Sequence, residues 1–525
     1  MIRIREISMS PEHNIAQLSY EAARFLKISP SKVRRVKIVR RSVDARKKPD
    51  VYIVYTIDVA VEGSEQKILK QSGCKRASIA PTAFYKPPKY AGEMKHRPIV
   101  IGFGPAGMFA ALILALAGQR PLVLERGEDA QSRHEKVQRF FETGRLDPKS
   151  NVQFGEGGAG TFSDGKLNTG VNNPRSGWIL EQMVAAGARE DILFDAKPHV
   201  GTDVLLTVVQ NIRQRIISLG GEVRFNSLVT GIQQENGKLS GVEVDGDVIP
   251  CDHAILAIGH SARDTFEMLM ENGICMEPKP FSMGVRIEHL QKNIDKAQYG
   301  KHDPVLPPAD YKLVKHLDDE TVYTFCMCPG GYVVAAASEE CRVVTNGMSY
   351  ADRDGENANA ALLVTLNPKD FPFDGPLGGM LWQQQIESAA YAYSGNYQAP
   401  GQLVGDFLAK RPSEGPRSVM PTYQPGVTWG DLHQVLPAKI TDALEKAIPA
   451  LDGNLKGFAD SDAVLTAPET RSSSPVRINR NEQKQSVTLQ GLYPAGEGAG
   501  YAGGIMSAAI DGILCAEAVL DGNKV

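Results

Sequence analysis

The stretch PIVIGFGPAGMFAALILALAGQRPLVLERG, residues 98–127, determines the fold class of most of the chain. It opens with an apolar strand over residues 99–101, and a helical run begins near Pro105 and Ala106. Three glycines at fixed spacing connect this strand to the helix: Gly102, Gly104 and Gly107. Glycines at these places permit a tight turn, let the backbone approach a pyrophosphate and let the helix pack closely on the strand. The N-terminus of the helix would then direct its N–H groups at phosphate.

A second apolar strand, over residues 122–124, ends in an acid, Glu125, which Arg126 follows. A carboxylate at this place binds the adenosine ribose hydroxyls and disfavours the 2′-phosphate of NADP. Gly102 and Glu125 are 125 − 102 = 23 residues apart, close to the roughly 20 expected. Strand, turn, helix, second strand and acid together predict an α/β, Rossmann-like dinucleotide-binding domain.

Two other glycine-rich stretches repeat the spacing without completing a second domain of this kind. FGEGGAGTFSDGKLNTG, residues 154–170, has no apolar strand before it, and GLYPAGEGAGYAGGIMSAAIDGI, residues 491–513, has no strand after its helix. We expect their glycines to lie against one bound cofactor, because a residue without Cβ allows close backbone approach. The residues concerned are Gly157, Gly158, Ser163, Gly496, Glu497, Gly503, Gly504 and Ile505.

From about residue 97 to residue 518 the chain resembles the glutathione-reductase-type FAD proteins, and it is similar to a bacterial family of FAD-dependent dehydrogenases. The resemblance implies FAD as the cofactor, held non-covalently or covalently on a GR2-like domain. It implies that the first glycine string and Glu125 hold the pyrophosphate and ribose, and that the loop from Gly157 to Ser163 passes the flavin. It also implies that the acid of the pair Gly496 and Glu497 binds the ribityl chain, with glutamate in place of the usual aspartate.

Other positions indicate which of these FAD proteins the chain resembles. Ala257 and Gly259 match a strand end of these proteins, with Ile258 in place of threonine. The last helix would point its N-terminus at the N1/O2 edge of the flavin. The sequence has no second nicotinamide-binding unit and no Cys-x-x-Cys, and Asp354-Gly355 lacks the Ser and Arg that follow it in aromatic hydroxylases. The pattern favours a dehydrogenase or reductase, to which NAD(P)H would donate electrons without a Rossmann domain of its own.

The chain divides into three predicted parts. Residues 1–95 form a basic α+β N-terminal domain, residues 96–265 plus 480–525 form the FAD-binding domain, and residues 266–479 form an inserted α+β substrate or cap domain. Within the first part, residues 24–48 hold a single acid, Asp44, among many lysines and arginines. This run is either a solvated face of a strand and turn, or a docking surface for an acidic partner or RNA.

Three arginines near the predicted domain junction are candidates for binding an anionic substrate: Arg286, Arg471 and Arg477. A guanidinium could orient a substrate carboxylate with two parallel hydrogen bonds. Arginines at a buried junction are costly unless they are paired, so each needs an acid such as Glu288 or Glu469, or a ligand anion. Structural ion pairs are the equal alternative.

Cys326 and Cys328 lie two residues apart in a strand-like run and would share one face of the strand. They are buried small hydrophobes, a redox pair or half of a metal site. Because the run is apolar and offers no neighbouring base, we predict that flavin reduction does not require them. No His or Cys pair with metal-like spacing accompanies them, so no metal is expected. We expect His199 and His260 to be structural.

Size, charge and cysteine content limit the functional class. A chain of 525 residues predicts two or three domains. A net charge of −3 argues against nucleic-acid or membrane binding by the chain as a whole. Seven scattered cysteines and a beginning without an apolar leader predict a cytoplasmic protein. The hypothesis is an FAD-dependent oxidoreductase that transfers hydride between a small anionic substrate and flavin N5. The alternatives are RNA docking through residues 24–48 and a flavin-binding scaffold without turnover.

Overall fold

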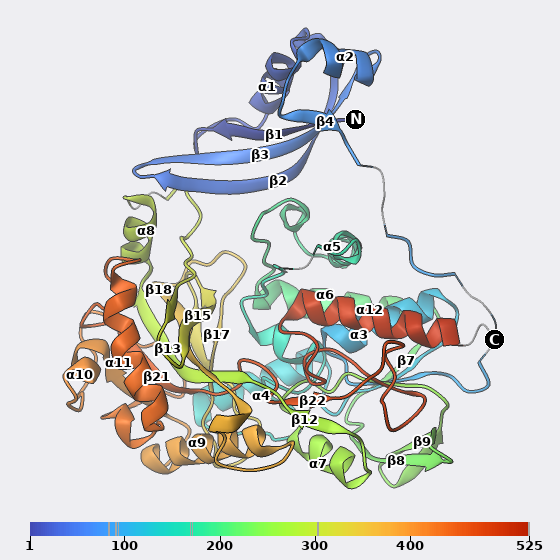
Figure 1. Ribbon diagram of the computed structural model, residues 1–525, viewed down its shortest axis with the longest axis vertical. Coiled ribbons are helices and arrows are strands. Elements are labelled where there is room, and N and C mark those ends of the chain that lie inside the picture. The colour runs from blue at the N-terminus through green and yellow to red at the C-terminus, as the bar shows by residue number, and fades with distance from the viewer. Residues whose placement is uncertain are drawn as a thin grey trace.

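The computed structural model describes residues 1–522 of the chain apart from 82–84, 90, 91, 93, 169, 171, 302 and 303. In Figure 1 a small N-terminal part, drawn in blue, stands above a large body formed by the rest of the chain. Residues 81–97, which follow the N-terminal part, lie partly outside the described residues.

The N-terminal part is a four-stranded antiparallel sheet with two helices, in the strand order β2-β3-β1-β4. Its elements are β1 (Ile2–Met9), α1 (Gln17–Leu26), β2 (Val33–Lys47), β3 (Asp50–Val61), α2 (Glu65–Ser72) and β4 (Ala77–Ile79). Leu18, Ala22 and Leu26 recur at helical spacing on α1 and are buried against the sheet. Strands and helices together make this part an α+β unit.

Strand β2 carries most of the basic run, and part of that run contacts the body of the same chain. The Arg41 Nε atom lies 2.6 Å from Asp195 Oδ1, and the Arg41 backbone N–H donates to the Phe194 carbonyl at 2.7 Å. The Lys48 ammonium donates to the Ala297 carbonyl at 2.6 Å. These contacts hold the N-terminal part on the body at two separate points.

A five-stranded parallel sheet forms the core of one half of the body. Its order is β23 (Leu492–Pro494), β11 (Ala254–Leu256), β5 (Ile99–Ile101), β6 (Leu122–Leu124) and β7 (Glu222–Arg224). Helix α3 (Pro105–Leu116) and helix α12 (Ile505–Gly522) pack against each other, with α6 (Thr202–Ser218) beside α3. Residues 106–115 of α3 are all buried, which explains why this helix is apolar on every side.

Residues 222–256 contribute strands to two different sheets. Strands β7 and β11 belong to the parallel sheet. Only β8 (Val229–Glu235), β9 (Lys238–Val244) and β10 (Asp247–Pro250) form an antiparallel meander, as a separate sheet. The cause is the long helix α6, which returns the chain alongside β6 so that β7 pairs in parallel.

The other half of the body is built on a seven-stranded sheet. Its order is β14 (Val314–His316), β15 (Thr321–Cys328), β18 (Asn357–Leu366), β13 (Phe281–Leu290), β21 (Val464–Glu469), β19 (Ala399–Leu403) and β20 (Val427–Trp429). The chain enters and leaves this half through β12 (Met276–Pro278) and β22 (Val476–Ile478), which pair with each other. The helices around it are α8 (Gln291–Tyr299), α9 (Gly378–Ser394), α10 (Val404–Leu408) and α11 (Ala438–Asp452).

Five further elements complete the body. They are α4 (Ala130–Thr143), α5 (Arg175–Ala185), α7 (Arg263–Glu271), β16 (Tyr332–Ala335) and β17 (Thr345–Met348). Among the described helices, none is long and apolar enough to cross a membrane.

Candidate active site

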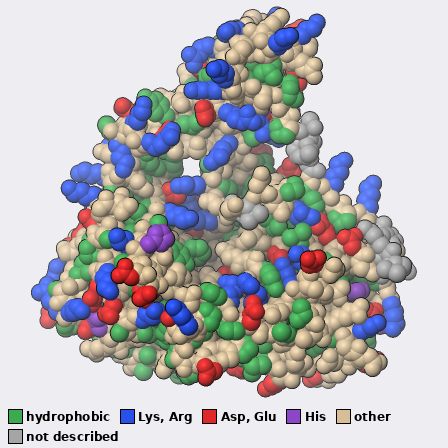
Figure 2. Space-filling model, viewed as in Figure 1, with side chains coloured by type: hydrophobic (Ala, Val, Ile, Leu, Met, Phe, Trp, Pro, Cys, Tyr) green, Lys and Arg blue, Asp and Glu red, His purple; other side chains and the backbone are tan. Residues whose placement is uncertain are grey.

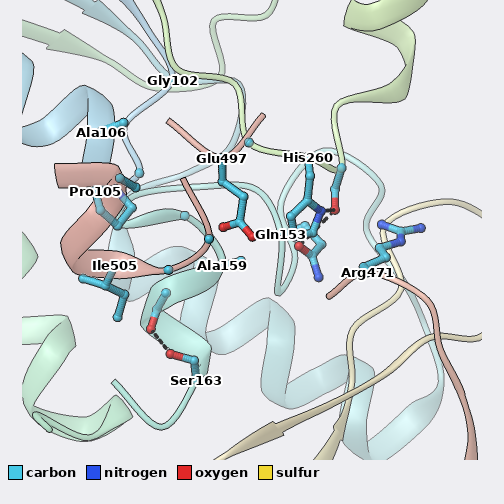
Figure 3. A pocket seen from close by; sticks show the side chains of 18 of the residues that line it. Gly102, Pro105, Ala106, Gln153, Ala159, Ser163, His260, Arg471, Glu497 and Ile505 are labelled. Carbon is cyan, nitrogen blue, oxygen red and sulfur yellow. Dashed lines mark hydrogen bonds and ion pairs between the residues drawn. The ribbon is translucent and has the colours of Figure 1, made fainter. Parts of the chain in front are cut away.

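A cavity of about 620 Å³ lies between the parallel sheet and the seven-stranded sheet. This volume falls within the range of small-molecule and cofactor sites. Figure 3 shows Pro105, Ala106 and Ile505 on one side of the cavity and His260 and Arg471 on the other, with Glu497 pointing into the space between them. Figure 2 shows a hollow between the N-terminal part and the body, with lysine and arginine side chains around it.

The first glycine string forms one wall of the cavity. Gly102 has φ +94°, and a Cβ there would lie 2.4 Å from the Ala257 carbonyl oxygen. A Cβ on Gly107 would lie 2.0 Å from the Gly102 carbonyl, so this glycine lets α3 pack on β5. A Cβ on Gly104 would meet only the Gly158 Cα, at 3.7 Å, and would enter the cavity. The backbone is therefore bare where a pyrophosphate would approach the start of α3.

Glu125 lines the cavity and is 4% exposed. Its carboxylate accepts backbone N–H groups from Phe103 at 2.8 Å, from Gly127 at 2.9 Å and from Gly155 at 2.9 Å. A carboxylate has about four acceptor positions, so one remains beyond these three bonds. Glu125 thus joins the two glycine-rich loops to β6, a structural role that the sequence does not reveal.

Most of the other predicted cofactor residues also line this cavity: Arg126, Gly158, Ser163, Ala257, Gly259, Glu497, Gly503, Gly504 and Ile505. Gly157 and Gly496, like Gly107, lie behind the residues that line the cavity. The Gly157 N–H donates to the Phe103 carbonyl at 2.9 Å, and the Gly496 N–H donates to Asp511 Oδ2 at 2.8 Å. Burial raises the pKa of the Glu497 carboxyl to about 7. Chain segments far apart in sequence therefore form one wall.

His260 lines the cavity next to Gly259, a place for which only a structural role was expected. Its Nε2 atom is 4.0 Å from Glu497 Oε1, and its Nδ1 atom is 3.1 Å from the Ser261 hydroxyl. Burial, followed by the charges of Arg471 and Arg263, lowers the pKa of His260 to about 3. The imidazole is therefore neutral at physiological pH. The sequence does offer one indication that His260 belongs to the site. The residue lies just past the carboxyl end of a parallel strand, where such folds place ligand contacts.

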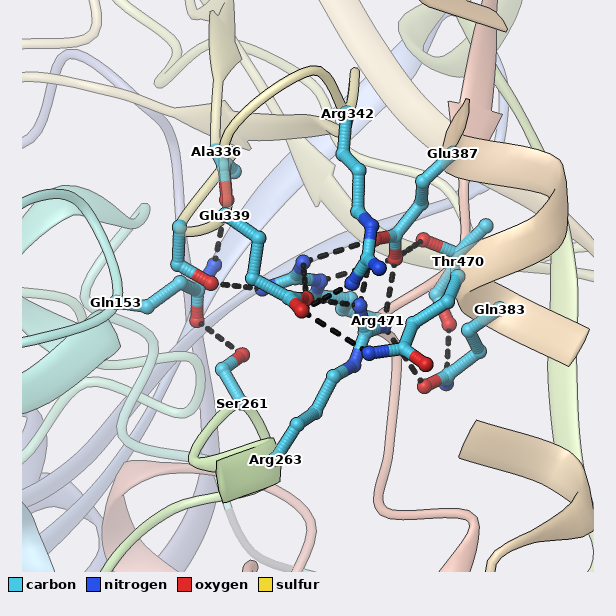
Figure 4. Close-up of polar contacts among 12 residues, drawn as sticks. Gln153, Ser261, Arg263, Ala336, Glu339, Arg342, Gln383, Glu387, Thr470 and Arg471 are labelled. Atoms are coloured by element: carbon cyan, nitrogen blue, oxygen red, sulfur yellow. Dashed lines mark hydrogen bonds and ion pairs between the residues drawn. The ribbon is translucent and has the colours of Figure 1, made fainter. Parts of the chain in front are cut away.

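Two buried arginines share one carboxylate beside the cavity (Figure 4). Arg263 Nη1 lies 2.8 Å from Glu387 Oε2 and Arg263 Nη2 lies 2.8 Å from Glu387 Oε1, so this pair is bidentate. Arg471 binds the same carboxylate through Nε at 3.0 Å and Nη2 at 2.8 Å. Glu339 pairs with both arginines. Burial raises the pKa of Glu387, but the two guanidinium charges outweigh burial and hold it well below its usual range.

The structure does not bring the three candidate arginines together. Arg471 lines the cavity. Arg286 is fully buried behind the cavity wall, with Nη1 3.2 Å from Glu469 Oε1. Arg477 has a side chain 41% exposed and lies 3.4 Å from Glu277. Because only one of the three arginines lines the cavity, they do not form a joint anion site. Glu469 is the acid partner expected for Arg286, whereas Glu288 accepts from Thr422 and Asn357.

Lysines supply the positive charge that the sequence did not locate. Lys166, Lys197 and Lys312 line the cavity on the side of the seven-stranded sheet, together with Tyr311. Lys197 is paired with Asp310 at 2.6 Å, and Lys312 is exposed. Cys326 and Glu469 line the same side. Among the described residues, no group of His, Cys, Asp and Glu side chains is placed to hold a metal ion.

Comparison with known proteins identifies the class. Residues 280–472 match the family described as FAD-dependent protein, C-terminal domain-like, and residues 1–60 match a domain of unknown function, DUF8436. These matches and the cavity make the chain a mixed α/β flavoprotein with FAD as its cofactor. An uncharacterized protein of Clostridium beijerinckii is 47% identical over 526 residues, which cover 99% of this chain and 98% of that protein. The chain belongs to the same family as this clostridial protein.

More distant similarities add little. Protein FixC of Salmonella typhi is 29% identical over 167 residues, 31% of this chain and 36% of that protein. The glycine oxidase of Bacillus cereus is 12% identical with a TM-score of 0.33, over 82% of this chain and 98% of that one. The glycerol-3-phosphate dehydrogenase of Bacillus halodurans, solved with FAD, is 12% identical with a TM-score of 0.36, over 82% and 66%. At such TM-scores the structural likeness carries no functional argument.

Proposed function

We propose that the chain is an FAD-dependent oxidoreductase that transfers hydride between a small anionic substrate and flavin N5. One observation carries the proposal: a single cavity is lined on one side by the glycine string and Glu125, and on the other by residues of the FAD-dependent C-terminal domain. Bound FAD supplies a two-electron carrier to this cavity. Substrate and cofactor would therefore share one enclosed space, as hydride transfer requires.

The residues that would hold FAD follow from the walls of the cavity. Residues 104–106 at the start of α3 would bind the pyrophosphate, and the free acceptor position of Glu125 would take a ribose hydroxyl. Glu497 and the N-terminus of α12, near Gly504, would contact the ribityl chain and flavin. This is the GR2-like arrangement that the sequence predicts. A Cβ on Gly503 or Gly504 would meet nothing within 4 Å, and a Cβ on Gly104 would meet only the Gly158 Cα. This bare backbone leaves room for the cofactor.

The opposite wall would bind and orient the substrate. Lys312 is exposed on this wall and would favour an anion. Lys166 lies 3.7 Å from Asp164, and Arg471 is paired with Glu387 and Glu339. Neutral His260 can donate or accept one hydrogen bond without adding charge. Burial raises the pKa of the Glu469 carboxyl to about 7, so it can hold a proton near neutral pH. These groups position the substrate and manage its proton.

Anaerobic reduction of the purified protein tests the proposal. The flavin absorbance would be followed during addition of NADH, NADPH and a panel of small carboxylates and phosphate esters. We expect at least one anionic compound to bleach the flavin. Failure of every hydride donor to do so would contradict the proposal and favour a scaffold without turnover.

Two exposed lysines three residues apart provide a matched pair for the substrate. Lys312 lines the cavity, whereas Lys315 on β14 does not. Lys312→Met should raise KM for the anionic substrate about fivefold with kcat little changed, because one exposed charge contact is worth about 1 kcal/mol. Lys315→Met should match the wild type. Equal KM values for both variants would remove the cavity wall from substrate binding.

RNA docking remains a separate proposal with weaker support. Arg34 pairs with Glu62, Arg41 with Asp195 and Arg46 with Asp44, so part of the basic run is neutralised within the chain. Arg35, Lys37 and Arg40 are exposed on β2. RNA binding that is steeply salt-dependent, and is lost when these three are changed to glutamate, would establish it.

A further inference from the structure

The strand β15 ends at the cavity in an irregular turn of backbone around Cys326. Its pairing with β18 shifts register between Phe325 and Cys328, and Cys326 has φ +40°. A side chain in the left-handed region is unfavourable and is retained where the surroundings impose it, often at functional sites. The bulge re-aims the side chains. Cys326 lines the cavity and is partly exposed, whereas Cys328 is completely buried.

The two cysteines are in contact with each other and with one buried charge. The Cys328 thiol donates to the Cys326 carbonyl oxygen at 3.2 Å. Arg286 Nη2 donates to the same carbonyl at 2.7 Å and lies 3.4 Å from the Cys328 sulfur. Because Arg286 is fully buried, its charge acts on the pair with little screening by water. The pair therefore lies beside a buried charge and not in the apolar setting that the sequence predicts. That flavin reduction does not require the pair stays a prediction.

The surroundings favour a thiolate at Cys326 over Cys328. The neighbouring Cys328 lowers the pKa of Cys326 against the opposing effect of burial, and Lys166 and Arg286 lower it further. Burial raises the pKa of Cys328. Cys251 and Cys515, which are also buried, have their pKa raised to about 12 by burial. Only a thiolate is nucleophilic, so the cavity-facing sulfur is the reactive one of the pair.

A carboxylate oxygen at the same wall supports a ligand there. Glu469 is 3% exposed and lines the cavity, and its Oε2 atom has no hydrogen-bond partner among the described residues. Its other oxygen binds Arg286. A buried polar atom without a partner is costly, which is the expected state of a group that contacts a bound molecule.

We propose that Cys326 and Cys328 form a redox-active dithiol that reduces small disulfides entering the cavity. The Cys326 thiolate attacks one sulfur of the disulfide, whose S–S bond breaks, and one thiolate leaves and takes up a proton. The Cys328 thiol then loses its proton and attacks Cys326 in the mixed disulfide. This step releases the second thiol and forms the Cys326–Cys328 disulfide. The protein dithiol is oxidised by two electrons and the small disulfide is reduced to two thiols.

The spacing of the two residues permits this bond. Residues two apart on a strand are at most about 6.5–6.8 Å apart between Cα atoms, and disulfides accept about 4.4–6.8 Å. The Cα separation of the pair therefore falls within the range that a disulfide accepts.

The test uses the full-length flavoprotein and hydroxyethyl disulfide as the probe. After acid quenching and alkylation, peptide mass spectrometry would report each cysteine. The wild type should lose two hydrogens across Cys326 and Cys328 and keep no adduct there. Cys328→Ser should accumulate the mixed disulfide on Cys326, because no thiol displaces it. Cys326→Ser should form neither product.

Cys341 provides the matched control because it is an exposed cysteine outside the cavity lining. At about pH 7 the probe should modify Cys326 at least about tenfold faster than Cys341, since reactivity follows the thiolate fraction. Cys341→Ser should leave the Cys326–Cys328 disulfide unchanged. Free thiols at both positions in the wild type, or a stable adduct on wild-type Cys326 without ring closure, would overturn the proposal. None of these readouts depends on flavin turnover, so the proposed oxidoreductase activity can fail without affecting them.

Discussion

The two walls of the cavity are built in opposite ways. The wall near α3 is made of glycines and backbone N–H groups, with Glu125 as its buried acid. The wall near the seven-stranded sheet presents charged and ionisable side chains, including Lys166, Cys326 and Arg471. A bare backbone suits a cofactor whose phosphates must approach closely, whereas varied side chains suit selection of a substrate. Substitutions should therefore affect cofactor binding at one wall, and stability or substrate selection at the other.

We expect the largest effect from Glu387→Gln, which removes a buried acid that supports the wall near the seven-stranded sheet. The change leaves Arg263 and Arg471 buried without their shared charge. Removing one partner of a buried ion pair costs about 3–5 kcal/mol. Chemical denaturation should show this loss in the free energy of unfolding. Arg477→Gln, which breaks the exposed pair with Glu277, is the control and should cost less than about 1 kcal/mol. Similar losses in both variants would contradict the buried network.

Gly102→Ala and Gly104→Ala separate packing from cofactor binding at the glycine wall. Alanine at residue 102 would have a positive φ and a Cβ 2.4 Å from a backbone oxygen, and should cost about 2–4 kcal/mol of stability. Alanine at residue 104 meets no close atom of the protein. Gly104→Ala should keep the melting temperature of the flavin-free protein and lose FAD affinity, measured by flavin retention on dialysis. Full flavin retention by Gly104→Ala would place the pyrophosphate elsewhere.

Glu125→Ala should affect both stability and FAD affinity. The sequence alone suggests loss of a ribose contact worth about 1.5–3 kcal/mol in an intact fold. The structure adds three backbone N–H groups that would lose their acceptor. We expect the flavin-free variant to lose about 2 kcal/mol of stability as well. Calorimetry of the flavin-free protein measures this loss of stability. A variant as stable as the wild type that still retains flavin through dialysis would refute both roles.

The smallest effect concerns the partly buried acid Glu497, whose side chain is 25% exposed. Its folded-state pKa of about 7 lies above the ordinary value of 4.5, so its favourable contribution is complete below about pH 4.5 and is lost as pH rises through about 7. In flavin-free protein, Glu497→Gln should therefore melt on the order of 1–2 °C above the wild type at about pH 8, and level with it at about pH 4.5. A gain for Glu497→Gln that is independent of pH would contradict the burial argument.

Local sequence patterns were sufficient to predict the glycine wall. The opposite wall depends on contacts between residues far apart in sequence, so it could not be predicted. Gly102, Gly104 and Glu125 follow from spacing within one βαβ unit, so sequence sufficed to place them. Arg41 pairs with Asp195 across 154 residues of sequence, and no local pattern reveals such a partner. The same holds for the opposite wall, which gathers side chains from loops near residues 166, 312, 326 and 471. Its charge sign was predicted, but from arginines that prove to be paired or remote.

The most direct test of the account is a crystal structure of the protein with FAD bound. The account predicts the pyrophosphate within hydrogen-bonding distance of the backbone at residues 104–106, a ribose hydroxyl on Glu125, and the flavin ring between the start of α12 and the wall that contains Cys326 and Arg471. FAD bound outside this cavity, or a flavin ring turned away from that wall, would contradict it.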